Sequence, residues 1–213
     1  MTDATIPPPR GTYRHGDLRR ALLQAGIELA RAGGPEAVTL REATRRAGVV
    51  PNAAYRHFAS QQDLLQAVRA AALSAVAISM EQELAALDEN LSAAALAKAS
   101  LRAIGIGYLR FARAEPGLFR AAFGTGPQSG STSNAEQAGS TGLNPFQLLS
   151  LALDRMAAAA VLPPERRAGA EYLAWSAVHG LAMLLINGLL RRMDDQQIES
   201  LIPRLLEMVE TGL

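Results

Sequence analysis

The polar side chains best suited to recognition chemistry are gathered between Thr39 and Leu65. Arginine, asparagine, tyrosine and histidine occur there at spacings that place them on the outer faces of two short helices. Guanidinium groups bind phosphate oxygens, and an asparagine amide can bind a base edge. We therefore favour DNA binding over an ordinary solvated helical hairpin. The candidate DNA-contacting residues are Arg41, Arg45, Pro51, Asn52, Ala53, Tyr55, Arg56 and His57.

Catalytic chemistry finds little support in the sequence. The histidines His15, His57 and His179 are scattered, and the chain lacks the H-E-x-x-H, G-K-[ST] and G-x-S-x-G patterns. The chain has no cysteine, which excludes disulfides and thiolate sites for metals or nucleophilic attack. We expect a protein that is not an enzyme, with no catalytic residue, no metal site and no cofactor.

Local signals position the candidate DNA-contacting residues on a helix-turn-helix. Thr39 and Glu42 have the spacing of a capping box, so a short helix begins near Leu40. Gly48 can end that helix in a left-handed conformation, and Pro51 suits the first position of the next helix. Two short helices joined by a three-residue turn that contains glycine cross steeply, as in DNA-binding proteins.

The stretch from Tyr13 to about Val68 resembles the DNA-binding domain of the tetracycline-repressor (TetR) family of transcriptional regulators. The resemblance rests on YRHGDLRRALLQAGIELARAGG, T-L-R-E-A, A-G-V, Y-R-H-F and S-x-x-D-L-L. It implies that residues 51–58 form the recognition helix, with Asn52 and Ala53 facing bases and Tyr55 and His57 near phosphates.

Three positions in this stretch depart from the family pattern. Ala43 stands where the family usually has a larger aliphatic residue, which predicts looser packing under the recognition helix. Val50 stands where the family usually has a serine that caps the recognition helix, and Gln61 stands where a lysine usually contacts phosphate. Loss of such a cap costs roughly 1 kcal/mol. These departures keep open the alternative of a helical ligand-binding protein or enzyme without specific DNA binding.

Charge is distributed unevenly along the 213 residues. Residues 1–60 hold nine arginines against five acidic residues (+4), and the remainder holds twelve basic against fifteen acidic residues (−3). This basic excess favours a nucleic-acid partner for the first part of the chain. The proline-rich residues 1–12 predict a disordered tail, from which Arg10 and Arg14 either reach a minor groove or remain solvated. No signal-peptide core is present near the N-terminus, so we expect a cytoplasmic protein.

Apolar residues recur at helical spacing along the rest of the chain, which predicts an all-α protein. We expect an N-terminal three-helix domain with the helix-turn-helix at 13–59, and a C-terminal helical ligand-binding and dimerisation domain at 60–213. Residues 124–142 are rich in glycine and serine and predict a mobile loop, and Pro203 should kink or break the last helix. The other expected helices are 17–32, 60–87, 92–114, 116–123, 145–161, 165–192 and 195–209.

The stretch 172–190 contains no formally charged residue. Its length makes it a transmembrane candidate, but Ser176, His179 and Asn187 favour a buried helix with no membrane. A helix that is apolar around its whole circumference must be buried on every side. Its own subunit covers one side, and we expect a second subunit to cover the other, which predicts a homodimer. The resemblance implies the same, because the last two helices of each subunit form a four-helix bundle in the family. W-S-A-V-H-G is similar to a W-x-x-x-H-G tag of one subgroup.

Aromatic and polar side chains along this stretch follow helical spacing and could line a ligand pocket with apolar walls from neighbouring helices. An ordinary core that contains a satisfied histidine is the alternative. The candidate ligand-binding residues are Tyr108, Phe111, Phe123, Met156, Tyr172, Trp175, His179, Met183 and Asn187, with Phe119 as a further wall residue.

Together these patterns predict a homodimeric transcriptional regulator, expected to be a repressor. The resemblance implies that two recognition helices enter successive major grooves of a double-stranded operator, roughly 34 Å apart. It also implies that an unknown small-molecule effector in the C-terminal domain changes this spacing and releases the DNA.

Overall fold

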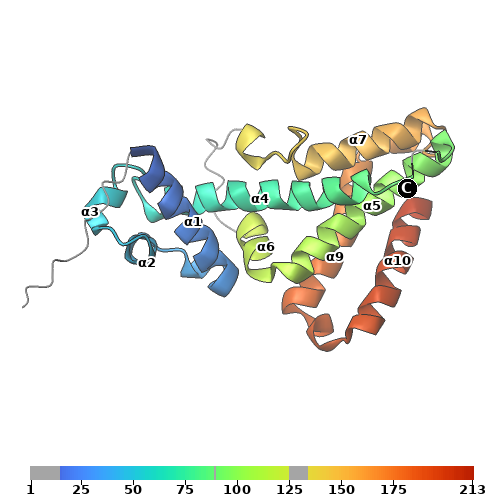
Figure 1. Cartoon of the computed structure of the whole chain (residues 1–213). Helices are drawn as coiled ribbons and strands as arrows, with labels where there is room; N and C mark the ends of the chain where they lie inside the picture. Colours follow the sequence, from blue (N-terminus) through green and yellow to red (C-terminus); the bar gives the residue numbers. More distant parts are fainter. Residues whose placement is uncertain (1–14, 89, 125–133) are drawn as a thin grey trace, which may run out of the picture.

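The computed structural model describes residues 15–88, 90–124 and 134–213. These ranges contain ten α-helices, three short 3-10 helices and no β-strand, which confirms the all-α class. The predicted tail at 1–12, with Arg10 and Arg14, lies outside the described residues. In Figure 1 the helices α1 to α3 occupy one end of the molecule, and α4 runs from them into a bundle formed by the later helices.

The first helices pack around a small apolar core. They are α1 (His15–Gly33), α2 (Leu40–Arg46) and α3 (Pro51–Ala54), with the 3-10 turn η1 (Pro35–Ala37) after α1. Leu22, Ala43 and Ala54 are fully buried between them. The predicted helix start is confirmed, since the Thr39 hydroxyl accepts a hydrogen bond from the Glu42 N–H at 3.2 Å. The predicted left-handed glycine is also confirmed, because φ of Gly48 is 67°.

The helix expected at 51–58 is shorter than predicted and ends at Ala54. The N–H groups of His57 and Phe58 both donate to the Ala54 carbonyl at 2.9 Å. The His57 bond spans only three residues, so the chain tightens into a turn that a regular α-helix would not make. Val50 precedes the helix without any side-chain capping bond, which also leaves α3 weakly supported at its start.

Helix α4 (Gln61–Ala85) begins close to its predicted start with a capping box, in which Ser60 and Asp63 exchange hydrogen bonds of 3.1 Å. It packs against α1 near its start and against α5 and α6 farther along (Figure 1). Among the described residues it is the one helix long and apolar enough to cross a membrane. Its fully buried residues, Leu64, Val68 and Val76 among them, pack against these other helices instead.

Five longer helices complete the fold, with short turns between some of them. Ser92, Asn144 and Asp194 cap three of these helices with side-chain hydrogen bonds, which is why the predicted starts are accurate. The longer helices are α5 (Ala93–Ala114), α6 (Pro116–Phe123), α7 (Pro145–Ala158), α9 (Ala170–Asn187) and α10 (Asp195–Gly212). The short elements are η2 (Asn134–Gln137), α8 (Pro164–Arg167) and η3 (Leu189–Arg192).

One prediction about the C-terminal helices is wrong, and of the kink or break expected at Pro203 the break does not occur. The single helix expected at 165–192 is divided into α8, α9 and η3. Gly169, with φ of 80°, precedes α9, and the extended Gly188 ends it, so the backbone leaves helical geometry at both glycines. Pro203 does not break α10, which continues through it. Pro203 is exposed, and the buried Ile198 and Leu206 hold the helix on either side of it.

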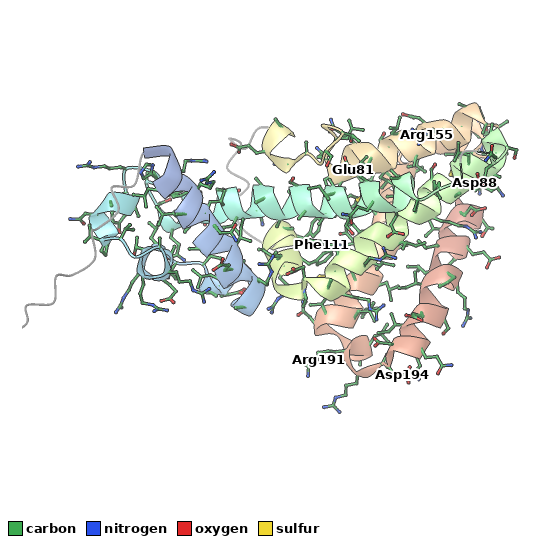
Figure 2. All side chains as sticks on the ribbon, in the orientation of Figure 1. Glu81, Asp88, Phe111, Arg155, Arg191 and Asp194 are labelled. Carbon is green, nitrogen blue, oxygen red and sulfur yellow. The ribbon has the colours of Figure 1, made fainter. Side chains whose placement is uncertain are left out.

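The loop expected at 124–142 is only partly described, because residues 125–133 lie outside the described ranges. The part that follows is not a free loop. The Glu81 carboxylate on α4 accepts hydrogen bonds from the Ser140 and Thr141 N–H groups at 2.8 and 2.9 Å. The Thr141 hydroxyl donates to the same carboxylate at 2.6 Å. Figure 2 labels Glu81 on α4. The composition of residues 124–142 predicted a mobile loop, because composition does not reveal that a carboxylate on another helix binds part of this stretch.

A buried carboxylate connects α7, α8 and α9. Glu171 is only 9% exposed, and its carboxylate accepts hydrogen bonds from Arg167 and from the Ser150 hydroxyl, each at 2.8 Å. Arg167 also pairs with Asp154 at 2.7 Å. Burial alone would raise the pKa of Glu171, but hydrogen bonds from its own backbone, Arg167 and Ser150 outweigh burial and hold the pKa below its ordinary value.

Replacing Arg167 with alanine tests this network. At neutral pH we expect the variant to lose about 2 kcal/mol of unfolding free energy, because a buried carboxylate loses its cation. Glu171 has a lowered folded-state pKa, so its contribution is present above the ordinary value of 4.5 and is lost as pH falls through the folded-state pKa. The difference between the proteins should therefore shrink at acidic pH. Urea unfolding of both proteins at a fixed protein concentration, at neutral and at acidic pH, measures this difference in unfolding free energy. Arg155→Ala, an exposed change on α7, is the control, and a pH-independent difference would contradict the account.

Replacing Val50 with serine tests the missing cap. Val50 is 69% exposed, so its removal sacrifices little buried surface, and a serine oxygen there can accept a hydrogen bond from the first turn of α3. We expect Val50→Ser to raise the unfolding free energy by about 1 kcal/mol and Val50→Ala to leave it unchanged. Equal effects of the two substitutions in urea unfolding would show that capping is not the cause.

Candidate nucleic-acid interface and ligand cavities

The predicted DNA-contacting residues lie on α2, on α3 and on the turn that follows α3, at one end of the molecule (Figure 1). Ala53 and His57 are half-buried against the domain. The remaining predicted contacts are exposed, which leaves their polar groups available to a duplex. The exposed residues are Arg41, Arg45, Pro51, Asn52, Tyr55 and Arg56.

The arginines on α2 differ in their electrostatic surroundings. The Arg45 guanidinium donates to the Glu42 carboxylate at 2.9 Å, and the hydrogen bond from Arg45 is the largest cause that lowers the pKa of Glu42. Arg46 lies 3.7 Å from the same carboxylate. Within 15–88, 90–124 and 134–213, Arg41 makes no ion pair. Arg41 is therefore the arginine of α2 whose charge is free to meet a phosphate, whereas Arg45 must first leave Glu42.

Five of the aromatic or imidazole side chains considered for the pocket form a cluster between α5, α6 and α9. This aromatic cluster consists of Tyr108, Phe119, Phe123, Trp175 and His179. The Tyr108 hydroxyl and His179 Nδ1 are hydrogen-bonded at 2.8 Å. The rings of Phe119 and Phe123 lie 4.8 Å apart, and those of Phe123 and Trp175 lie 5.8 Å apart. Burial lowers the pKa of His179 and raises that of Tyr108, so both groups are held neutral.

The predicted ligand-binding residues are not brought into one pocket. Tyr108 and Trp175 border a cavity of about 30 Å³ between α4, α5, α7, α9 and α10, which has room for little more than a water molecule. Phe111 and Met156 are buried in the core. Figure 2 labels Phe111 on α5, within the bundle. Tyr172 is 69% exposed on the surface of α9.

The other predicted residues, Phe123, Met183 and Asn187, border a cavity of about 530 Å³, within the usual size range for small-molecule sites. We call it the interdomain cavity, because its walls come from η1, the first turns of α4, α6 and the end of α9. Its lining residues are Pro35, Glu36, Gln61, Gln62, Leu65, Gln66, Arg69, Arg120, Ala121, Phe123, Gly124, Met183 and Asn187.

A third hollow, of about 840 Å³, lies between α5, η3 and α10. It is bordered by none of the predicted ligand-binding residues. Arg191, at its rim, is exposed and points away from the bundle in Figure 2. Its walls include much of α10, one of the two helices expected to contact a second subunit.

Sequence reasoning missed the two arginines of the interdomain cavity. Arg69 donates to the Ala121 carbonyl at 3.3 Å and also to the Gly124 carbonyl, which ties α4 to the end of α6. Arg120 Nε is buried and has no hydrogen-bond partner in the part of the chain that the structure describes. Neither arginine belongs to a recognised motif, and no sequence signal indicated that these parts of α4 and α6 meet.

Comparison with known proteins identifies both halves of the chain. The family model described as bacterial regulatory proteins of the tetR family matches residues 22–68. The model described as tetracyclin repressor-like, C-terminal domain matches residues 101–209. No curated protein sequence matches the chain.

Several solved structures share the fold. A protein of unknown function from Rhodococcus sp. RHA1 is 23% identical, with a TM-score of 0.75 over 96% of this chain and 99% of that one. The TetR-family regulator PfmR from Thermus thermophilus is 18% identical, with a TM-score of 0.57 over 90% and 95%. A TetR variant from Acinetobacter baumannii AYE in complex with minocycline is 18% identical, with a TM-score of 0.58 over 91% of each chain.

The C-terminal family model spans half of the chain, and the N-terminal model covers the helix-turn-helix that precedes it. The two models match the two parts that the structure shows, which are the helices α1 to α3 with an exposed polar face on α2 and α3, and the helical domain behind them. The chain belongs to the TetR family of DNA-binding transcriptional regulators, which are not enzymes.

Proposed function

We propose that this regulator is a homodimeric, cytoplasmic repressor whose operator affinity falls when a small molecule binds in the domain at 60–213. The observation that carries the proposal is the position of α6. This short helix contacts α1 of the DNA-binding domain on one side and supplies two rings of the aromatic cluster on the other. A ligand that displaces α6 would therefore affect both the aromatic cluster and the contact of α6 with the DNA-binding domain.

The contact between α6 and α1 is made backbone to backbone. A Cβ atom at Gly117 would lie 2.3 Å from the Ala30 carbonyl oxygen and 2.5 Å from that of Arg31. Glu115, just before α6, pairs with the Arg31 guanidinium at 2.8 Å. Because no flexible side chain separates the two backbones, a shift of α6 cannot be absorbed locally and would move the end of α1.

The opposite side of α6 faces the ligand-binding domain. Phe119 is fully buried and stacks on the His179 ring at 5.7 Å, and Phe123 borders the interdomain cavity. The minocycline-bound relative supports a small-molecule effector for this fold. A coupling of about 1 to 3 kcal/mol would lower operator affinity roughly 5- to 150-fold, which is enough for induction.

Dimerisation is proposed for the apolar surface of α9 and α10. Leu173 and Leu184, on one face of α9, are 64% and 43% exposed, and Gly180 between them has open space around it. On α10, Met208 is 58% exposed. Single exposed apolar residues are ordinary, but a row at helical spacing indicates a surface that a second subunit covers.

Fluorescence anisotropy of the protein with DNA from upstream of its own gene, against shuffled DNA across a salt series, tests the proposal. We expect a preference of roughly a thousandfold that weakens as salt rises. Arg41→Ala should weaken binding to both DNAs. It should also reduce the slope of log affinity against log salt concentration by about one. Asn52→Ala should lose about 1 to 3 kcal/mol for the operator only.

The alternative is a helical ligand-binding protein that has lost specific DNA binding, which Val50 and Gln61 favour. Equal and weak binding to both DNAs would support it where a genome-wide binding selection also yields no preferred site. An operator found elsewhere in the genome by that selection would exclude it.

Replacing Leu184 with glutamate tests the dimer surface. A dimer that buries this unpaired carboxylate should be about 3 kcal/mol less stable, which weakens association roughly a hundredfold. Sedimentation velocity should show a monomer with an unchanged helical circular dichroism spectrum. Gln82→Glu, an exposed substitution on α4, is the control. A Leu184→Glu protein that remains dimeric would place the interface elsewhere.

Replacing Gly117 with alanine tests the contact between α6 and α1. The added methyl group cannot fit against the Ala30 carbonyl, so α6 must move. We expect operator affinity to fall about tenfold or more (~1.4 kcal/mol) without any effector, while the helical spectrum is retained. Gly212→Ala, where a Cβ meets no atom within 4 Å, should bind the operator normally. Normal binding by Gly117→Ala would remove α6 from the coupling route.

A further inference from the structure

Arg120 lines the interdomain cavity and carries a donor without a partner among the described residues. Its Nε is shielded from solvent and makes no hydrogen bond within the described ranges, and within the same ranges the Arg120 guanidinium pairs with no carboxylate. An arginine cannot lose its proton at physiological pH, so its charge persists in this site. Buried donors are almost always satisfied, and an unmade bond to a charged group is especially unfavourable. An acceptor that enters the cavity and reaches the Arg120 guanidinium would satisfy this charge.

The charges around the cavity specify what kind of acceptor fits. Arg69 and Arg120 contribute two positive charges and Glu36 contributes one negative charge, which gives a net charge of +1. The N–H groups of Arg69 already donate to two backbone carbonyls, whereas Arg120 is uncommitted. A monoanion neutralises this lining, whereas a dianion would leave it negative. A carboxylate also matches the planar fork of a guanidinium.

The remaining walls are amides and apolar side chains. Gln61, Gln62 and Asn187 can donate to ligand oxygens or accept from ligand hydroxyls. Leu65, Phe123 and Met183 form the apolar part. Few polar groups beside apolar walls are typical of sites for amphipathic small molecules.

We propose that the interdomain cavity binds an organic monocarboxylate with an apolar body, whose carboxylate pairs with Arg120. The assignment of this ligand as the effector rests on the proposed function. The proposal that the ligand binds in the interdomain cavity does not depend on it. Arg120 lies beside Gly34 at the end of α1, and Arg69 ties α4 to α6. The ligand therefore meets α6, α4 and the DNA-binding domain at once.

Isothermal titration calorimetry on the full-length protein without DNA tests the proposal. The probes are decanoate and phenylacetate, each compared with the alcohol of the same carbon skeleton, and decyl phosphate as a dianion. We expect at least one carboxylate to bind about tenfold or more tightly than its alcohol and more tightly than decyl phosphate. Binding of neither carboxylate, equal binding of acid and alcohol, or tighter binding of the phosphate would overturn it.

Variants separate Arg120 from a general effect of charge. Arg120→Gln should weaken carboxylate binding about tenfold or more and leave binding of the alcohol unaffected. Arg120→Lys should retain part of the carboxylate affinity, because lysine keeps the positive charge but lacks the planar guanidinium. Arg155→Gln, on α7 (Figure 2) and away from the three cavities, should bind normally. Unchanged binding by a folded Arg120→Gln protein would overturn the assignment.

Operator anisotropy with and without the carboxylate distinguishes the two proposals. Carboxylate binding together with operator release supports both. Carboxylate binding that leaves the operator complex intact supports the site and contradicts its role in repression. Operator binding without carboxylate binding contradicts the site and leaves the repressor proposal standing.

Discussion

The close approach of α6 to the end of α1 is the constraint on which the rest of the structure depends. A side chain at Gly117 would overlap the carbonyl oxygens of Ala30 and Arg31, so the two backbones meet directly. Arg69 fixes the other end of α6 to α4, and Arg31 pairs with Glu115 beside it. The DNA-binding helices are thus held against the C-terminal domain by direct backbone contacts, so we expect a small displacement of α6 to change their orientation.

The DNA-binding end is less firmly built than the bundle that carries it. The recognition element is a four-residue helix without a side-chain cap, followed by a turn fixed by the buried Phe58. Glu42 holds Arg45 in an ion pair, which the predicted phosphate contact of Arg45 would have to replace. In the bundle, by contrast, the carboxylates of Glu171 and Glu81 are each satisfied by several donors. A short, uncapped recognition element on a rigid support suits binding that must be reversible.

Local signals predicted much of the fold. Capping residues such as Thr39, Ser60 and Ser92 fixed helix starts because a cap acts within three residues along the chain. The sequence did not reveal that Gly169 and Gly188 divide a long apolar run, since glycine is tolerated within helices as well as at their ends. Cavity residues were the least predictable. Arg69 and Arg120 lie on polar faces, and only the packing of α4 against α6 brings them together around one cavity.

The central claim is that α6 sets the distance between the two recognition helices of a dimer. The chain has no cysteine, so Ala59→Cys supplies one labelling site, exposed just after the recognition element. Pulsed electron paramagnetic resonance on the spin-labelled dimer would measure the distance between the two copies of residue 59, with Gly117 intact and with Gly117→Ala. The account predicts a narrow distance distribution with Gly117 intact and a displaced or broadened one with alanine. Identical distributions would contradict it.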